Sequence, residues 1–332
     1  MLKKKRIKLK GVGRRSQYFS SSSQEYFSSG CVVLDCVLGG GWAENKIINV
    51  VGDQSTGKTL VAIEAMINFL QKHPKGLLVF DESEATFDNA YADMIGLDID
   101  RVTFLNSTTV EDWFRNKYSF IDRKDKSPLL YVTDSMDGIS DRREMERDIG
   151  DETYGTKAKM MSEAFRKGLP TRLHKANITT FIISQLRDNI GAMFGEKKKR
   201  SGGKALDFYS SQILWLRHMA QIDKTRNKIK RVIGVDIEAY CKKNKVGMPW
   251  RKCNFPLLFN YGIDDIAASL NWMESNFILS EFTDRKVAAE LSKVSGLDNS
   301  ELIEYKKDLK IFLVDKWNII EQGFQPLRGK YR

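Results

Sequence analysis

Four residues near the end of a short apolar segment have the types and spacing of a phosphate-binding loop. Gly52, Gly57, Lys58 and Thr59 in "VVGDQSTGKT" fit the pattern G-x-x-x-x-G-K-[ST]. Glycines let backbone N–H groups turn toward phosphate oxygens, the lysine reaches the β and γ phosphates, and the threonine hydroxyl is a ligand for Mg²⁺. The predicted nucleotide-binding residues of this loop are Gly52, Asp53, Gln54, Ser55, Thr56, Gly57, Lys58 and Thr59.

Carboxylates end two other apolar segments. Asp134 closes "PLLYVTD", where it can hold Mg²⁺ together with Thr59. The segment "LLVFDESEATFDNAY" ends in several acids, and a glutamate there can position the water that attacks the nucleotide. Residue chemistry leaves both Glu82 and Glu84 open for that role, and a solvated acidic turn is the alternative for each.

These residues need a scaffold that brings the ends of several strands together. Apolar segments of strand length alternate with helical patterns from residue 46 to residue 184, and they are apolar throughout rather than alternating. Such strands are buried on both faces, which predicts an α/β fold with a mostly parallel central sheet and helices on both sides. Helices are expected at 59–72, 86–95, 109–122 and 153–175.

The pattern changes after Ser184. Residues 186–207 lack periodicity and predict a long functional loop. Apolar segments at 211–218, 230–244 and 254–260, with a charged turn at 223–230, predict antiparallel strands added to the sheet edge. Helical patterns at 264–275, 284–293 and 299–322 predict a small C-terminal helical appendage.

The charge balance favours polyanionic partners. The chain of 332 residues has 54 Lys and Arg against 43 Asp and Glu, a net charge of +11, and its first twenty residues hold eight Lys or Arg and no acid. Its four cysteines form no C-x-x-C pair, and no apolar segment reaches the roughly 18 residues that span a bilayer. We therefore expect a cytoplasmic protein that does not reside in a membrane.

Several stretches together resemble the RecA recombinase family, over residues 28–265. These are "SSGCVVLDCVLGGG", the phosphate loop, "DESEATFDNAYADMIGLDID", "MERDIGDETYGTKAKMMSEAFRK", "FIISQLRDNIGAMFGEKKKRSGGKALDFY" and "KKNK" at 242–245. The resemblance implies a RecA-like ATPase core that uses ATP and Mg²⁺, with Glu84 as the catalytic glutamate. It also makes Asp88 and Tyr91 the adenine contacts and Gln185 a switch that senses the γ-phosphate.

The same resemblance implies two DNA-binding loops and a site completed by a neighbouring subunit. The implied residues of the first loop (about 146–156) and its following helix are Arg147, Tyr154, Lys157 and Lys159. Those of the second loop (about 186–204) are Arg187, Ile190, Phe194, Lys197, Lys198, Lys199, Arg200, Gly202 and Gly203. Lys243 and Lys245 would reach across a subunit interface to the neighbour's ATP, as an arginine finger does. With Lys58, Glu84 and Gln185 they complete the expected catalytic set.

The implied function is that of a DNA-dependent ATPase. It would form an open helical filament on single-stranded DNA and exchange strands with homologous double-stranded DNA, in recombination and repair. The expected organisation is a basic, Ser-rich arm at 1–29, the ATPase core at 30–265 and a helical C-terminal domain with a basic tail at 266–332. The rival readings are a ring-forming helicase and a non-catalytic protein that keeps ATP as a structural ligand.

The sequence also departs from the family that it resembles. Residues 1–29 are basic and Ser-rich where the family has a long amphipathic helix, and Asp207 stands where a lysine is common. The second loop is more cationic, which predicts a steeper salt dependence of DNA binding. The segment "GFQPLRGKYR" has three positive charges in place of the family's acidic tail, so we expect little restraint on duplex binding.

Overall fold

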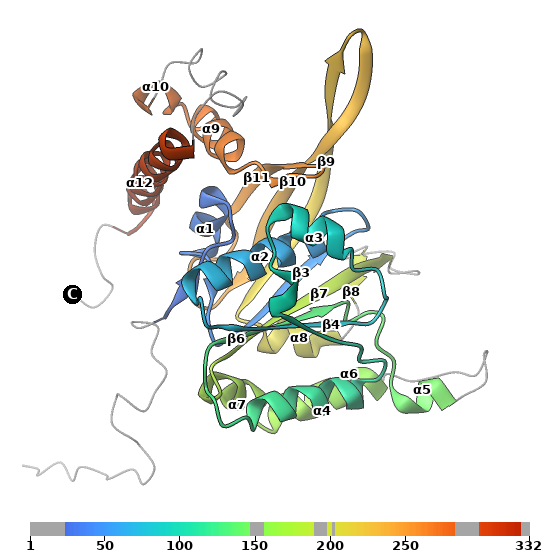
Figure 1. Ribbon diagram of the computed structural model, residues 1–332. Helices are drawn as coiled ribbons and strands as arrows, with labels where there is room; N and C mark the ends of the chain where they lie inside the picture. Colours follow the sequence, from blue (N-terminus) through green and yellow to red (C-terminus); the bar gives the residue numbers. More distant parts are fainter. Residues whose placement is uncertain (1–23, 147–155, 189–197, 201–202, 283–298, 327–332) are drawn as a thin grey trace, which may run out of the picture.

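A computed structural model describes residues 24–146, 156–188, 198–200, 203–282 and 299–326 (Figure 1). Its strands are β1 Tyr26–Phe27, β2 Trp42–Ala43, β3 Ile47–Gly52, β4 Leu77–Glu82, β5 Val102–Leu105, β6 Leu129–Asp134, β7 Ile178–Asp188, β8 Lys198–Arg200, β9 Gln212–Arg226, β10 Ile229–Asn244, β11 Lys252–Leu258 and β12 Gly262–Ile263. Its helices are α1 Val32–Leu38, α2 Lys58–Lys72, α3 Asn89–Ile95, η3 Ile99–Arg101, α4 Val110–Ile121, α5 Arg142–Glu146, α6 Thr156–Arg166, α7 Leu169–Lys175, α8 Gly203–Tyr209, α9 Asp265–Ser275, α10 Leu279–Phe282 and α12 Asn299–Gly323.

The large sheet has the strand order β12-β11-β10-β9-β3-β7-β6-β4-β5, and β8 pairs with β7. Strands β9, β3, β7, β6, β4 and β5 run parallel, whereas β10, β11 and β12 continue the sheet in antiparallel pairs. The expected α/β class is therefore confirmed. One detail was wrong, because β9 extends the parallel part of the sheet instead of opening the antiparallel edge.

Both faces of the inner part of the sheet are buried, and successive residues of a strand point to opposite sides. In β3, Ile48 and Val50 belong to a core covered by α1, α2, α9 and α12. Ile47 of the same strand belongs to a second core, covered by α4, α6, α7 and α8. This arrangement explains why the inner strands are apolar without alternation. The parallel strands then carry all their carboxyl ends to one edge of the sheet.

The described parts of the segment after Ser184 form regular elements that its lack of periodicity does not predict. Strand β7 continues to Asp188, β8 pairs with it antiparallel, and α8 begins at Gly203. The expected helix at 153–175 is two helices, because the chain turns at Gly168 with a φ of 89°. Both departures arise from pairing and turn geometry that hydrophobic periodicity does not record.

The predicted turn at 223–230 is instead the outer part of a long β9–β10 hairpin. The chain reverses only at Asn227 and Lys228, whose φ angles of 50° and 64° match the two-residue type I′ turns that fit twisted hairpins. Figure 1 shows this hairpin projecting away from the helices and the rest of the sheet.

The two ends of the described chain pack onto the main core. Phe27 in β1 is only 2% exposed, so the fold includes residues that were expected in the arm. In α12, Leu309 and Leu313 join the core that includes α1 and α2. Trp272 and Trp317 lie with ring centroids 5.4 Å apart. The helix predicted at 284–293 lies outside the described residues. Across those that are described, no helix has both the length and the hydropathy to cross a bilayer.

Candidate nucleotide and DNA site

The phosphate loop joins the end of β3 to the start of α2. Ser55 and Gly57 have positive φ angles of 60° and 77°, which fold the loop backbone tightly before the helix begins. A Cβ at Gly52 would lie 2.4 Å from Thr56 Oγ1, and one at Gly57 would lie 2.3 Å from a methyl group of Leu257. The loop therefore needs glycine at both positions. Its backbone N–H groups and the start of the 15-residue helix α2 fit a phosphate group.

Lys58 lies at the start of α2, and its ammonium bends back over the loop. Its Nζ donates a hydrogen bond of 2.5 Å to the carbonyl oxygen of Asp53. Burial lowers the pKa of Lys58, and the carboxylates of Asp134 and Asp53 oppose that change. The loop thus holds a partly desolvated cation, the kind of group that a phosphate oxygen can draw away from a backbone carbonyl.

Thr59 and Asp134 provide two adjacent oxygen ligands. The Thr59 hydroxyl donates to Asp134 Oδ2 at 2.6 Å. Burial raises the pKa of Asp134 to about 6, the Thr59 hydrogen bond and Lys58 oppose this, and the nearby Glu84 and Glu82 add to it. Hard oxygen donors in a crowded acidic site are the donor set that Mg²⁺ takes, so these residues fit the metal.

Glu84 receives hydrogen bonds from two neighbouring strands. Its Oε1 accepts from the Ser135 hydroxyl at 2.7 Å, just after β6, and from the Gln185 side-chain amide at 3.1 Å, in β7. The backbone N–H of Gln185 donates to Asp137 at 2.7 Å. The carboxyl ends of three parallel strands thus bring Glu84, Gln185 and Asp134 together.

Glu82 has a different role in the fold. Its Oε1 accepts from the backbone N–H groups of Thr86 and Phe87, the second at 2.7 Å. It therefore stabilises the turn that follows β4. Of the two glutamates that residue chemistry left open, Glu84 is the one whose side chain, within the described residues, has hydrogen bonds to the side chains of Ser135, directly after β6, and Gln185 in β7.

Asp88 and Tyr91 lie at the start of α3. Asp88 caps the helix, because its side chain accepts from the Tyr91 backbone N–H at 2.9 Å. The half-buried Tyr91 ring packs against the core covered by α2, and burial raises the pKa of its hydroxyl, an effect that the backbone of Asn260 opposes. The contacts among the described residues do not join Tyr91 to the phosphate loop.

Lys243 and Lys245 lie at the other end of β3 from the phosphate loop. Lys243 donates to the carbonyls of Asp207 and Phe208, and Lys245 donates to Phe208 at 3.0 Å, so both cap the last turn of α8. The backbone of Lys245 bonds to Ser211, which bonds in turn to Ile47 at the start of β3. Because β3 has six residues, about 17 Å separates its two ends.

The DNA-binding residues are only partly described. Arg147, Tyr154, Ile190, Phe194, Lys197 and Gly202 lie outside the described residues. Arg187 lies in β7, the residues from Lys198 through Lys199 to Arg200 form β8, and Gly203 begins α8. Lys159 is exposed, whereas the ammonium of Lys157 turns inward to the carbonyls of Met136 and Ile139.

Sequence reasoning missed contacts of four residues at this site. The hydroxyl of Ser135 donates to Glu84, a contact that it did not predict. It did not consider Asp137, or the carbonyls of Asp207 and Phe208 that hold the two lysines. The polar run "TDSMDG" after a buried strand was the available signal for the first two. Backbone carbonyls leave no signal in a sequence.

Comparison with known proteins fits this geometry. The family model described as the RecA N-terminal domain matches residues 11–264. Protein RecA of Streptococcus pyogenes serotype M1 is 31% identical over 323 residues, which covers 95% of this chain and 83% of that protein. Protein RecA of Bacteroides thetaiotaomicron is 31% identical over 289 residues, which covers 84% of this chain and 85% of that protein. The chain therefore belongs to the RecA family.

Proposed function

We infer that this RecA-family chain is an ATP-dependent DNA recombinase that assembles on single-stranded DNA and exchanges strands with a homologous duplex. One observation carries the inference from family to chemistry. Glu84, two residues after the end of β4, is held by Ser135, directly after β6, and by Gln185 from β7, next to Asp134. A protein that kept nucleotide only as a structural ligand would have no use for a carboxylate held in this way.

ATP and Mg²⁺ are proposed as the ligands of the loop and the adjacent acid. The backbone of residues 52–57 and the ammonium of Lys58 would hold the phosphates, and Thr59 with Asp134 would hold the metal. Bound Mg²⁺ would neutralise charge on the phosphate oxygens. Asp88 and Tyr91 are proposed for the adenine end, since Asp88 caps α3 and Tyr91 lies in its first turn, shortly after Glu84 in the chain.

Glu84 is proposed as the group that orients the attacking water and accepts its proton. Its carboxylate accepts hydrogen bonds from Ser135 and Gln185. It therefore already lies at the carboxyl edge of the parallel strands, where the phosphate loop begins. Gln185 continues along β7 into the proposed second DNA loop. A change in the Glu84–Gln185 contact on nucleotide binding would therefore act directly on that loop.

The lysines at the end of β10 support assembly as part of the mechanism. Lys245 is level with the start of β3, about 17 Å along that strand from its own loop, and Lys243 and Lys245 both donate to carbonyls at the end of α8. Neither can serve its own loop without a large rearrangement. They can serve the site of an adjoining subunit. A head-to-tail contact of this kind, repeated without closing, generates a filament. Its proposed DNA ligands are single-stranded and double-stranded DNA, bound by the two loops. We also place its action in a reducing cytoplasm, because its four cysteines are free thiols.

The test measures ATP hydrolysis with and without single-stranded DNA and images the same samples by electron microscopy. We expect DNA to stimulate turnover and open filaments to form. The variant Lys58→Ala should abolish hydrolysis. Closed rings would favour a helicase, and nucleotide binding without any turnover would favour a non-catalytic binder.

A further inference from the structure

Residues 135–139, which follow strand β6, lie directly against the proposed catalytic carboxylate. The Ser135 hydroxyl donates to Glu84 at 2.7 Å. Ser135 is itself fixed to Ser83, whose hydroxyl donates to the Ser135 carbonyl at 2.9 Å. A Cβ at Gly138 would lie 2.3 Å from the Ser83 hydroxyl, so this segment passes closely over the residue that precedes Glu84. The position of segment 135–139 therefore affects the position of the Glu84 carboxylate.

Lys157 holds the same segment from the first turn of helix α6. Its ammonium donates hydrogen bonds to the backbone carbonyls of Met136 and Ile139. The two acceptors are three residues apart, so one cation joins both ends of the turn between them. The side chains of Met136 and Ile139 are 0% and 2% exposed, and they share a core with Met161 of α6. A movement of the first turn of α6 would therefore carry segment 135–139 with it.

The two lysines at the start of α6 have different surroundings. Lys159 is exposed, whereas Lys157 is partly buried. To reach a DNA phosphate, Lys157 would have to leave two carbonyls of buried residues at once, and a buried acceptor without a donor is costly. Hydrogen bonds from an ionised donor are also stronger than those between neutral groups. Lys157 is therefore better suited to a contact within the protein than to a phosphate contact.

We propose that Lys157 is a positioning residue for Glu84, which links the first DNA loop to ATP hydrolysis instead of binding a DNA phosphate. Helix α6 follows that loop, at about 146–156, and its first turn holds the segment that contacts Glu84. DNA bound by the loop would shift this turn, and the two hydrogen bonds would pass the shift to Ser135 and so to the carboxylate. The inference rests on the proposed function for the identity of the reaction and of the loop.

The test replaces Lys157 in the full-length chain. Lys157→Met keeps an apolar stem and removes the ammonium, Lys157→Gln leaves one neutral donor for the turn, and Lys157→Arg restores a cation that can donate to both carbonyls. The matched control is Arg166→Met, which removes an exposed cation from the last turn of the same helix. Each variant is measured for ATP turnover at saturating oligo-dT, for binding of a fluorescent ATP analogue, and for oligo-dT affinity over a series of salt concentrations.

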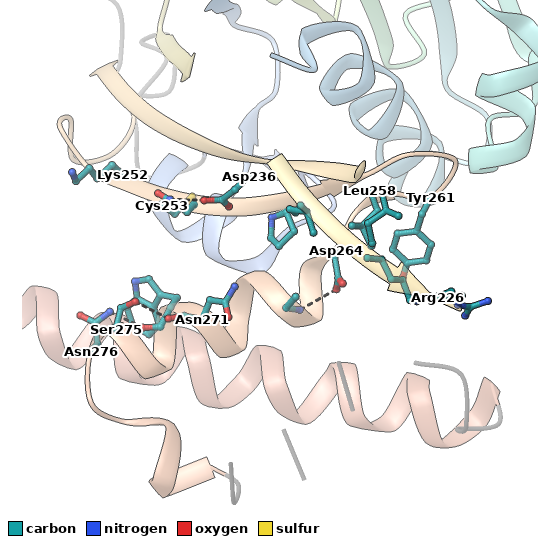
Figure 2. Close-up of a pocket in the computed structure, with 17 residues that line it drawn as sticks. Arg226, Asp236, Lys252, Cys253, Leu258, Tyr261, Asp264, Asn271, Ser275 and Asn276 are labelled. Carbon is teal, nitrogen blue, oxygen red and sulfur yellow. Dashed lines mark hydrogen bonds between the residues drawn. The ribbon is translucent and has the colours of Figure 1, made fainter. Parts of the chain in front are cut away.

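Lys157→Met should lower kcat at saturating oligo-dT by about 10- to 100-fold, because small displacements of reacting groups have effects of that order. Lys157→Gln should show a smaller loss, Lys157→Arg should recover most of the turnover, and Arg166→Met should resemble wild type. The ATP analogue should bind as in wild type, which also shows that the variants are folded. The salt slope of oligo-dT binding should not change. Lys157 also lies outside the groove of about 1250 Å³ between strands β9 to β11 and helix α9 (Figure 2), so its replacement leaves that surface intact.

A double variant separates positioning from a merely structural role. If Lys157 acts through Glu84, adding Lys157→Met to Glu84→Gln should slow turnover by only about 2-fold more. A further loss as large as that in the wild-type background would overturn the proposal. So would unchanged turnover in both Lys157→Met and Lys157→Gln, and so would a salt slope lower by about 0.7, the value for one lost phosphate contact on a single strand.

Failure of oligo-dT to stimulate wild type would instead contradict the recombinase function. The double variant would then be compared on DNA-free turnover, which still tests whether Lys157 acts through Glu84.

Discussion

Glu82 and Glu84 are two residues apart, yet their carboxylates have different partners. The first accepts two backbone N–H groups of its own turn, whereas the second accepts from side chains on two other strands. Ala85, directly after Glu84, has a φ of 51° and turns the chain before Phe87. Alanine gives no sequence signal for a left-handed conformation, so residue chemistry alone could not separate the two glutamates.

We predict that Glu84→Gln retains ATP binding and slows turnover by about 10²- to 10⁴-fold, because an amide cannot accept the proton of the attacking water. Glu82→Gln is the matched control. Its side-chain oxygen can still accept the N–H groups of the turn, so turnover should remain near wild type. Steady-state ATP hydrolysis and equilibrium binding of a fluorescent ATP analogue measure both effects. If Glu82→Gln were the slower enzyme, the assignment would have to be reversed.

At the scale of elements, α1 connects the first described residues to the core. Asp35 in α1 accepts hydrogen bonds from Ser29 N at 2.7 Å, from Ser29 Oγ at 2.6 Å and from Ser28 Oγ at 2.6 Å. Burial raises the pKa of Asp35 to about 6, although these hydrogen bonds oppose the change. The carboxylate form is therefore costly in the folded protein.

The raised pKa of Asp35 predicts a pH dependence of stability with a definite sign. The folded state holds this proton more tightly than the unfolded state, so the contribution is fully present below about pH 3.8 and is lost as pH rises through about 6. The loss is on the order of 3 kcal/mol. Asp35→Asn should remove it, so the difference in unfolding free energy between wild type and variant should fall over this interval.

Denaturant unfolding at several pH values measures that difference. Asp93→Asn is the control, because the Asp93 side chain is exposed on α3 and should leave the pH profile as it is in wild type. A constant difference between wild type and Asp35→Asn from pH 4 to pH 7 would show that Asp35 does not titrate in this interval.

The buried strands of the sheet could be predicted from the sequence, whereas the outer part of the β9–β10 hairpin could not. Buried parallel strands such as β3 and β6 have continuous apolar sequences, so their positions followed from hydrophobicity. The outer hairpin has exposed side chains on both faces and so lacks that signal. Asn227 and Lys228 hold a type I′ turn without the glycine that usually marks one. The pairing of β9 with β3 depends on contacts between distant segments, which periodicity does not encode.

At the scale of the whole molecule, the sheet separates two halves of one proposed catalytic site. The phosphate loop, Glu84, Asp134 and Gln185 share the carboxyl edge of the parallel strands, whereas Lys243 and Lys245 lie at the amino end of β3. Sequence motifs predicted both sets of residues. They could not place them on opposite edges, because strand order and direction set that distance.

This separation predicts complementation between two inactive variants. Lys58→Ala removes the cation of a subunit's own loop, and Lys243→Ala removes the cation it would offer to its neighbour. Lys242→Ala is the control, since the Lys242 ammonium lies over the Trp215 ring and should leave turnover near wild type. Each of the first two variants alone should have little DNA-stimulated ATP turnover.

Mixed in equal amounts on single-stranded DNA, Lys58→Ala and Lys243→Ala should recover about a quarter of wild-type turnover. In a randomly mixed head-to-tail filament, about that share of interfaces joins an intact loop to an intact lysine. Each lysine would then leave the carbonyls of α8 for a phosphate on the next subunit. If Lys243 acted within its own subunit, or only by capping α8, no interface in the mixture would be complete and turnover would not recover.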